Sequence, residues 1–232
     1  MRLSLDLGTL VLYDPPEGLT PPAYFQWDAR FDRWRTQAHH YRQVIAAYKQ
    51  SAQSHTNAAP AYRRLTLSSR LTQAPPPFQS EALEDWDTAG RRGVVILPTG
   101  AGKSYVGQKA IETVQRSTLV VASTIDLMNQ WYDRSCAAFE KTNGLIGGGY
   151  YEIEDLTVTT YDSACRHMDR LGNRWGLIIF DECRHLMGEV YSHAAQMCLA
   201  PYRLGLTATP ERAVRRTHRP AGLYQGHHRS CR

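Results

Sequence analysis

The segment Leu97–Ser104, which reads LPTGAGKS, constrains the fold of this 232-residue chain more than any other stretch. It follows a predicted strand, residues 93–97, and opens a predicted helix, residues 103–115. Its glycines allow backbone N–H groups to turn inward around a phosphate, and the helix N-terminus adds a partial positive charge. A chance Gly-Lys-Ser turn is the alternative interpretation. The strand before the segment and the helix after it favour a phosphate-binding loop.

This loop contains the residue types that bind a nucleotide together with Mg²⁺. Lys103 would reach the β- and γ-phosphates, and the hydroxyl of Ser104 would ligate the metal ion. Leu97 stands where the general pattern has its first glycine, so the prediction depends on the flanking elements as well as on the residues. The rest of the predicted cradle is the backbone of Thr99, Gly100, Ala101 and Gly102.

Two carboxylates, Asp181 and Glu182, directly follow the apolar run at residues 177–180. A buried strand of this kind delivers its last side chains to the carboxyl edge of a parallel sheet, where ligands bind. Asp181 would hold Mg²⁺ through water, and Glu182 would orient and polarise an attacking water molecule. A solvated acidic pair at a strand end is the alternative, and the phosphate-binding loop upstream favours the functional interpretation.

Short β-rich runs alternate with helical patterns over the larger part of the chain, which indicates βαβ units. We therefore predict an α/β fold, a mostly parallel sheet with helices on both faces. The helical patterns cover residues 103–115 and 125–139, and the further strands are predicted at 118–122, 156–160, 177–180 and 203–207.

The apolar runs and the cysteines of the sequence indicate where in the cell the protein is located. The sequence has no apolar run near the roughly 18 to 20 residues of a membrane-spanning helix, and its first residues break up too soon for a signal peptide. The five cysteines include no Cys-x-x-Cys pair, which favours reduced thiols over a zinc site. We expect no membrane partner and a location in the cytoplasm, associated with the nucleoid if the source is bacterial.

Residues 1–74 are predicted to form a separate, small α+β domain. Alternation over residues 3–13 indicates one or two strands, residues 24–27 a further one, and apolar spacings over residues 28–53 a helix. The three prolines 75–77 mark its end. Aromatic residues interleaved with arginines, such as Trp34 beside Arg35, would suit DNA contact. The solvated face of an amphipathic helix is the alternative that we favour for these arginines.

The net charge of +5 comes from the end of the chain, because residues 211–232 contain six arginines and one acid. Residues 1–210 are therefore neutral overall. Residues 213–232 are predicted to form a basic, disordered tail. A frameshift in the gene is the alternative explanation for this abrupt change in composition.

Taken together, these segments resemble the ordered motifs of superfamily 2 helicases and are most similar to the XPB-like branch of DNA helicases. The likeness covers about residues 75–212. Residues 98–104, 181–185 and 207–210 resemble motifs I, II and III, residues 124–131 and 158–164 resemble motifs Ia and Ib, and residues 78–83 with Trp86 resemble the segment before motif I.

The resemblance implies the first of two RecA-like domains that close on ATP and track along single-stranded or forked DNA. Gln79 would then lie near the adenine. The residues expected to touch the DNA backbone are Thr124, Gln130 and Thr160, which suits their neutral donors. Thr207 and Thr209 would couple the nucleotide site to the DNA. Ordinary helix packing is the alternative role for Gln130 and its neighbour Trp131.

Departures from the family pattern bear on activity, the first of them in motif II. The family has histidine where this chain has Arg184, and His185 follows one position later; arginine stays charged and accepts no hydrogen bond, so coupling is expected to weaken unless His185 substitutes. The sequence also shows no second RecA-like domain, which a partner would have to supply in trans. The alternatives to a helicase are a weak or inactive ATP- and DNA-binding module, a truncated relic, and the motor of a restriction or remodelling system.

Overall fold

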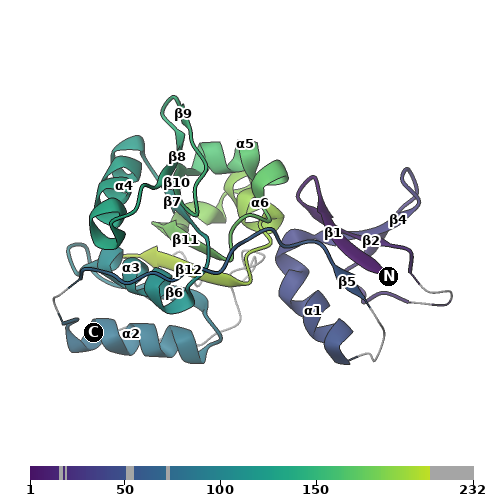
Figure 1. Cartoon of the computed structure of the whole chain (residues 1–232), viewed down its shortest axis with the longest axis horizontal. Helices are drawn as coiled ribbons and strands as arrows, with labels where there is room; N and C mark the ends of the chain where they lie inside the picture. Colours follow the sequence, from purple (N-terminus) through teal and green to yellow (C-terminus); the bar gives the residue numbers. More distant parts are fainter. Residues whose placement is uncertain (16–17, 19, 51–54, 72–73, 210–232) are drawn as a thin grey trace.

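The computed structural model describes residues 1–15, 18, 20–50, 55–71 and 74–209, and two β-sheets organise this part of the chain (Figure 1). The N-terminal sheet has five strands, and the second sheet has seven. The predicted basic tail, residues 213–232, lies outside the described residues. Among the residues that are described, no helix is both long and apolar enough to cross a membrane.

The N-terminal sheet is mixed, because its last strand joins in parallel while the other pairs are antiparallel. The predicted pair of strands over residues 3–13 is confirmed as a hairpin. Its turn places Leu7 at φ 45° and Gly8 at φ 73°, the left-handed conformations of a tight two-residue turn. In spatial order the strands are β3 (Gln26–Asp28), β4 (Arg33–Gln37), β2 (Thr9–Tyr13), β1 (Arg2–Asp6) and β5 (Thr56–Asn57).

The predicted helix over residues 28–53 is wrong in its first half. A 3-10 turn, Ala38–His40, leads into the only helix of this region that the structure describes, α1 (Tyr41–Gln50). Residues 33–37 instead form β4, which pairs with β2 and β3 and so satisfies its backbone groups on both sides. The four-residue spacing of Trp34 and Ala38 fits one face of a strand as well as one face of a helix, so spacing alone could not separate the two.

The seven-stranded sheet confirms the predicted α/β architecture. Its strands are parallel except for the last, which pairs antiparallel with its neighbour. The central strands are buried at every position, as expected for apolar runs covered on both faces. In spatial order they are β6 (Arg92–Ile96), β12 (Tyr202–Thr207), β11 (Leu177–Asp181), β7 (Thr118–Ala122), β10 (Leu156–Thr160), β8 (Gly144–Gly147) and β9 (Tyr150–Tyr151).

Helices cover both faces of this sheet (Figure 1). One core contains residues of α2 (Pro77–Thr88), α3 (Lys103–Val114) and α4 (Ile125–Phe139), and the other contains residues of α5 (Tyr161–Leu171) and α6 (Glu189–Met197). The predictions of α3 and α4 are confirmed. Helix α2 was not predicted, because the three prolines were interpreted only as a break, whereas Pro77 is well suited to the first position of a helix.

The segment that joins the two sheets, residues 61–71, packs along the larger domain. The backbone N–H of Leu65 donates to the carbonyl oxygen of Gln115 at 3.0 Å, and that of Leu67 donates to the Gln115 side chain at 2.7 Å. Leu65, Leu67 and Leu71 lie against the core of α2, α3 and α4. The division after residue 74 stays a prediction.

The two domains contact each other through α6 and the residues that follow it. Leu199 is buried in the core of the N-terminal domain, and Gln37 donates to the side chain of Gln196 at 3.2 Å. His39 is buried beside this contact, at 9% exposure. The fully buried Arg203 lies close enough to repel a charge on His39, and it donates to the carbonyl oxygens of Ala195, Cys198 and Ala200.

His39 makes the domain contact sensitive to acid. Burial, and after it the charges of Arg203, His40 and Arg92, lower the pKa of His39 from 6.5 to about 3. Above pH 6.5, His39 is neutral in both the folded and the unfolded chain, and its protonation does not lower stability. Between pH 6.5 and about 3, His39 is protonated only in the unfolded chain. As the pH falls through this range, the free energy of unfolding therefore decreases by up to about 1.4 kcal/mol per pH unit.

We expect His39→Gln to reduce the loss of stability on acidification, because glutamine does not titrate. Urea unfolding followed by circular dichroism across this pH range measures the slope for both chains. His167→Gln, on α5, is the matched control and should keep the wild-type slope. An unchanged slope in His39→Gln would contradict the assignment.

Candidate nucleotide site and nucleic-acid edge

The loop between β6 and α3 forms an open backbone cradle. Gly100 and Gly102 adopt left-handed conformations, at φ 82° and φ 78°, and Gly102 is the residue from which α3 begins. A Cβ atom added to Gly100 would meet nothing within 4 Å, whereas one added to Gly102 would lie 2.5 Å from Nε2 of Gln79. Thr99 and Gly100 are exposed, so the loop faces solvent at the N-terminus of a 12-residue helix, where anions bind favourably.

Gln79 lies directly against this loop. It comes from α2, is 6% exposed, and its Nε2 donates to the carbonyl oxygen of Ala101 at 2.8 Å. The glutamine predicted to lie near an adenine therefore holds the backbone of this loop. Its role toward a base stays a prediction.

The sheet brings the two predicted carboxylates to the same edge as the loop, because only β12 separates β11 from β6. Glu182 follows β11 in a left-handed conformation, at φ 51°. Its Oε1 lies 3.7 Å from Nζ of Lys103, and its Oε2 lies 3.7 Å from Nε of Arg184. This carboxylate is thus paired with two cations, one of them the lysine of the loop.

Asp181 is 7% exposed and is held by two donors. The indole Nε1 of Trp131 donates to Oδ2 at 2.8 Å, and the backbone N–H of Glu182 donates to Oδ1 at 3.1 Å. Burial raises the pKa of Asp181 above its ordinary value, and the hydrogen bond from Trp131 opposes that rise. Trp131 therefore favours the ionised carboxylate.

Two residues of α4 that were not among the predicted site residues, Trp131 and Arg134, contact this site. Trp131 is 2% exposed and reaches Asp181 from α4, across 50 residues of chain. Arg134 is exposed on the same helix, and its guanidinium donates to Oγ of Ser104 at 2.8 Å. Met128 and Trp131 are buried and three residues apart in α4, a spacing that indicates one helix face packed on the sheet. No pattern in the sequence identifies the strand end that this face meets.

The predicted coupling residues are linked to this edge by hydrogen bonds and ring contacts. Thr207 ends β12; its carbonyl oxygen accepts from the N–H of Leu97 at 3.0 Å, and its hydroxyl accepts from the N–H of Thr209 at 3.3 Å. The ring centroid of His185 lies 5.8 Å from that of Tyr161, whose hydroxyl donates to the carbonyl oxygen of Asp181 at 3.0 Å. Thr207 and Thr209 therefore lie beside the loop, and His185 lies near the carboxylates.

The residues predicted to touch DNA lie further along the same edge. Thr124 follows β7 and Thr160 ends β10, and these two strands are neighbours in the sheet. Each hydroxyl accepts a hydrogen bond from the first turn of the helix that begins after it. Gln130 is exposed on α4. The structure thus gives both threonines a capping role, and it brings the N-termini of α4 and α5 to neighbouring places on the edge.

The donor set near the loop fits Mg²⁺. The hydroxyl of Ser104 and the carboxylate of Asp181 are hard oxygen ligands, and Mg²⁺ is commonly bound by one or two such side chains together with phosphate oxygens and water. Both ligands are supported by neighbouring donors, Arg134 and Trp131.

Two protein families match this chain, one over each sheet. Residues 72–212 match the family described as type III restriction enzyme, res subunit. Residues 3–59 match the family described as the Xeroderma pigmentosum group B helicase damage recognition domain.

Individual relatives are similar over more than half of the chain. The "DNA 3'-5' translocase XPB2" of Sulfurisphaera tokodaii is 47% identical over 135 residues, which are 58% of this chain and 30% of that protein. The "DNA 3'-5' helicase XPB" of Kineococcus radiotolerans is 35% identical over 144 residues, which are 57% of this chain and 26% of that protein. The chain thus spans less than a third of the length of these curated relatives.

One solved structure shows a similar fold over both domains. The UvsW helicase of bacteriophage T4 aligns with a TM-score of 0.51 and 15% sequence identity, covering 90% of this chain and 92% of that chain. At this identity the likeness concerns the fold alone.

Proposed function

Because the chain belongs to the XPB-like helicases of superfamily 2, with an XPB damage recognition domain followed by a helicase domain, we propose that it binds and hydrolyses ATP as the motor of a DNA helicase or translocase. Members of this family are ATP-dependent DNA helicases. The observation that carries the proposal is the shared edge at which the open loop, Lys103 and the Asp181–Glu182 pair lie together.

The proposed roles follow from the contacts at that edge. Lys103, which pairs with Glu182 at 3.7 Å, would bind the β- and γ-phosphates instead. Glu182, released from Lys103, would orient the attacking water and accept its proton. Gln79 would hold the loop from below and face the base. Mg²⁺, when bound, would neutralise developing charge on the phosphates, and Ser104 and Asp181 would hold it.

DNA contact is proposed for both domains. On the larger domain, the N-termini of α4 and α5 present backbone N–H groups near Thr124 and Thr160, which suits contact with phosphates that does not read sequence. Gln130 would add a side-chain donor. On the N-terminal domain, for which we propose the bounds 1–74, the match to a damage recognition domain supports binding of DNA. Single-stranded or forked DNA is the substrate that we propose.

Coupling between hydrolysis and DNA is proposed to run through Thr207 and Thr209, and through the end of β11. Arg184 holds Glu182 from the side opposite Lys103, in the place where the family has a histidine. His185 packs near Tyr161 and would take over the neutral hydrogen-bonding role of that histidine.

A slower motor, or a binding module without turnover, is the second candidate, and Arg184 favours it. A second RecA-like domain, from further sequence or from a partner in trans, would bring arginine fingers to the γ-phosphate. Such a finger is worth about 10³ to 10⁵ in turnover. We therefore expect slow hydrolysis by these 232 residues alone.

Steady-state ATP hydrolysis by the purified chain tests the proposal, measured without DNA, with single-stranded DNA and with forked DNA. Lys103→Ala sets the background, because it removes the cation of the loop. Lys141→Ala is the matched control, since Lys141 pairs with Asp155 on another part of the domain.

We expect turnover that DNA stimulates, that Lys103→Ala abolishes and that Lys141→Ala retains. Turnover equal in wild type and Lys103→Ala, with nucleotide binding retained, would reject the motor and support the binding module. A wild-type chain that neither binds nor hydrolyses ATP would reject both candidates.

A further inference from the structure

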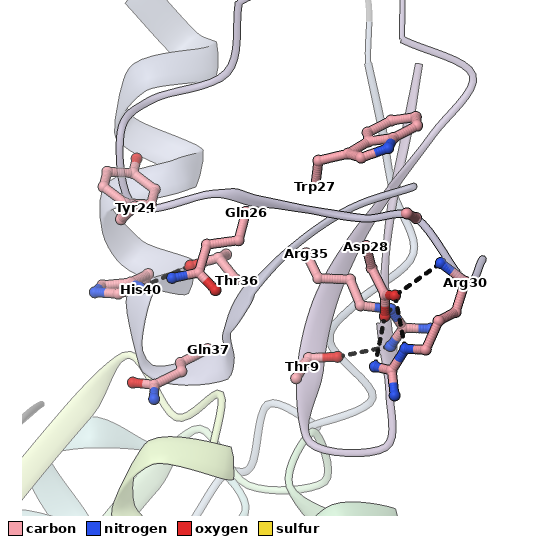
Figure 2. Close-up of a pocket in the computed structure, with 11 residues that line it drawn as sticks. Thr9, Tyr24, Gln26, Trp27, Asp28, Arg30, Arg35, Thr36, Gln37 and His40 are labelled. Atoms are coloured by element: carbon pink, nitrogen blue, oxygen red, sulfur yellow. Dashed lines mark hydrogen bonds and ion pairs between the residues drawn. The ribbon is translucent and has the colours of Figure 1, made fainter. Parts of the chain in front are cut away.

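A cavity of about 690 Å³ lies in the N-terminal domain, away from the nucleotide site (Figure 2). It is formed by the β3–β4 hairpin, the start of β2 and the turn before α1. Its volume lies within the range of about 300 to 1,000 Å³ that is typical of sites for small organic ligands. None of the residues of the phosphate-binding loop lines it.

One end of the cavity is aromatic and uncharged. The ring centroids of Tyr24 and His40 lie 4.9 Å apart, and Nδ1 of His40 is hydrogen-bonded to the hydroxyl of Thr36 at 2.8 Å. Burial, together with the charges of Arg92 and Arg203, lowers the pKa of His40, so its ring is neutral at neutral pH. Two adjacent rings of this kind offer a surface on which a planar base can stack.

A side-chain amide also lines the cavity. Gln26 is exposed, and Figure 2 shows its side chain extending toward Thr36 and His40. An amide has both donors and an acceptor, which is the chemistry that reads the edge of a nucleobase. Gln37, which also lines the cavity, donates to Gln196 of the larger domain at 3.2 Å.

The other end holds two arginines around one carboxylate. Arg30 donates to Asp28 from Nε at 3.0 Å and from Nη2 at 3.1 Å, while its side chain stays 81% exposed. Nε of Arg35 lies 3.4 Å from the same carboxylate, and its Nη2 donates to Asp6 at 2.8 Å. The carboxylates therefore orient both guanidiniums. The five donors of the exposed Arg30 exceed what Asp28 can accept, which leaves it able to bind a phosphate.

We propose that this cavity binds a single nucleotide that is unpaired or turned out of a DNA duplex, with its base against Tyr24, its edge on Gln26 and its phosphate at Arg30. The inference deepens the proposed function, because it rests on DNA being the partner of this domain. A cavity of this size takes one nucleotide, not a duplex. Turning a base out of a duplex costs a few kcal/mol and least where pairing is already lost, so the site would favour DNA with a weakened base pair.

The test measures binding of the whole chain to two labelled duplexes by fluorescence anisotropy, without ATP. One duplex is fully paired, and the other carries one unpaired nucleotide. We expect the wild type to bind the second about 10-fold tighter, which corresponds to one stacked base. Gln26→Ala and Arg30→Ala should reduce that preference at least about 5-fold, because the paired duplex has no free nucleotide to place in the cavity.

Gln43→Ala and Arg166→Ala, both at exposed positions away from the cavity, are the matched controls and should keep the preference. A wild type without preference, or variants that weaken both duplexes equally, would overturn the proposal. If free deoxynucleoside monophosphates displace the labelled duplex as effectively as unlabelled duplex does, the cavity is instead a site for free nucleotide, and the proposal is overturned. Because the assay contains no ATP, a chain that fails to hydrolyse ATP can still show the preference, so the two proposals fail separately.

Discussion

Replacing Glu182 by glutamine is expected to lower the turnover of DNA-stimulated ATP hydrolysis by about 10² to 10⁴-fold, the usual contribution of a positioned general base. Glutamine keeps the size of the side chain but cannot accept a proton from the attacking water. Its effect should therefore fall on kcat.

Binding of ATP should persist in this variant or become tighter. Glu182 is paired with both Lys103 and Arg184, and removing its charge frees both cations for the phosphates. Affinity for a fluorescent ATP analogue and kcat, measured on the same preparation, separate the two effects. Glu84→Gln, on the exposed surface of α2, should leave both unchanged. Equal losses of affinity and turnover in Glu182→Gln would argue for a structural role of the carboxylate.

Trp131→Ala should lower the free energy of unfolding by about 3 to 5 kcal/mol, as large-to-small changes of buried aromatic residues do. The indole is 2% exposed in the core beneath α4, and it lies so close to Gly107 that a Cβ there would come within 2.6 Å of the ring. Urea unfolding of the variant and the wild type measures the loss. A loss under about 1 kcal/mol would contradict this packing.

Trp131→Phe separates the hydrogen bond from the packing. Phenylalanine keeps an aromatic ring but has no N–H for Oδ2 of Asp181, and a buried acceptor that loses its donor costs about 1 to 3 kcal/mol. Since that bond lowers the pKa of Asp181 while burial raises it, the pKa should rise further in the variant. The proposed role of Asp181 as a Mg²⁺ ligand requires the ionised carboxylate, so activity should be lost at a higher pH on acidification than in the wild type.

The pH profile of kcat/KM for ATP measures this shift of the acidic limb. Trp175→Phe is the matched control, because Trp175 is equally buried, at 2% exposure, but packs in the core of α5 and α6. It should change stability without moving the profile. A profile that is the same in Trp131→Phe and in the wild type would show that the indole only packs.

Some features of this protein follow from residues that are close in sequence. The phosphate-binding loop is one, because its left-handed glycines and the start of α3 are set by residues 97–104. The parallel sheet is another, since its central strands are short runs that are buried at every position. The carboxylates at the end of β11 reach the loop as predicted, because parallel strands share one carboxyl edge.

Other features arise only when distant segments meet. The spacing in residues 28–40 fitted a helix, but β2 and β3 offered hydrogen bonds on both sides and made residues 33–37 a strand. That strand also builds the cavity between Tyr24 and Arg30. The support of Asp181 by Trp131 and of Ser104 by Arg134 depends on how α4 packs over the sheet. The sequence by itself thus determined the loop, the alternation of strands and helices and the acidic strand end, because these depend on local conformation and burial period. Only the tertiary structure decided which donor meets which acceptor, because such contacts join residues whose distance along the chain carries no periodic signal.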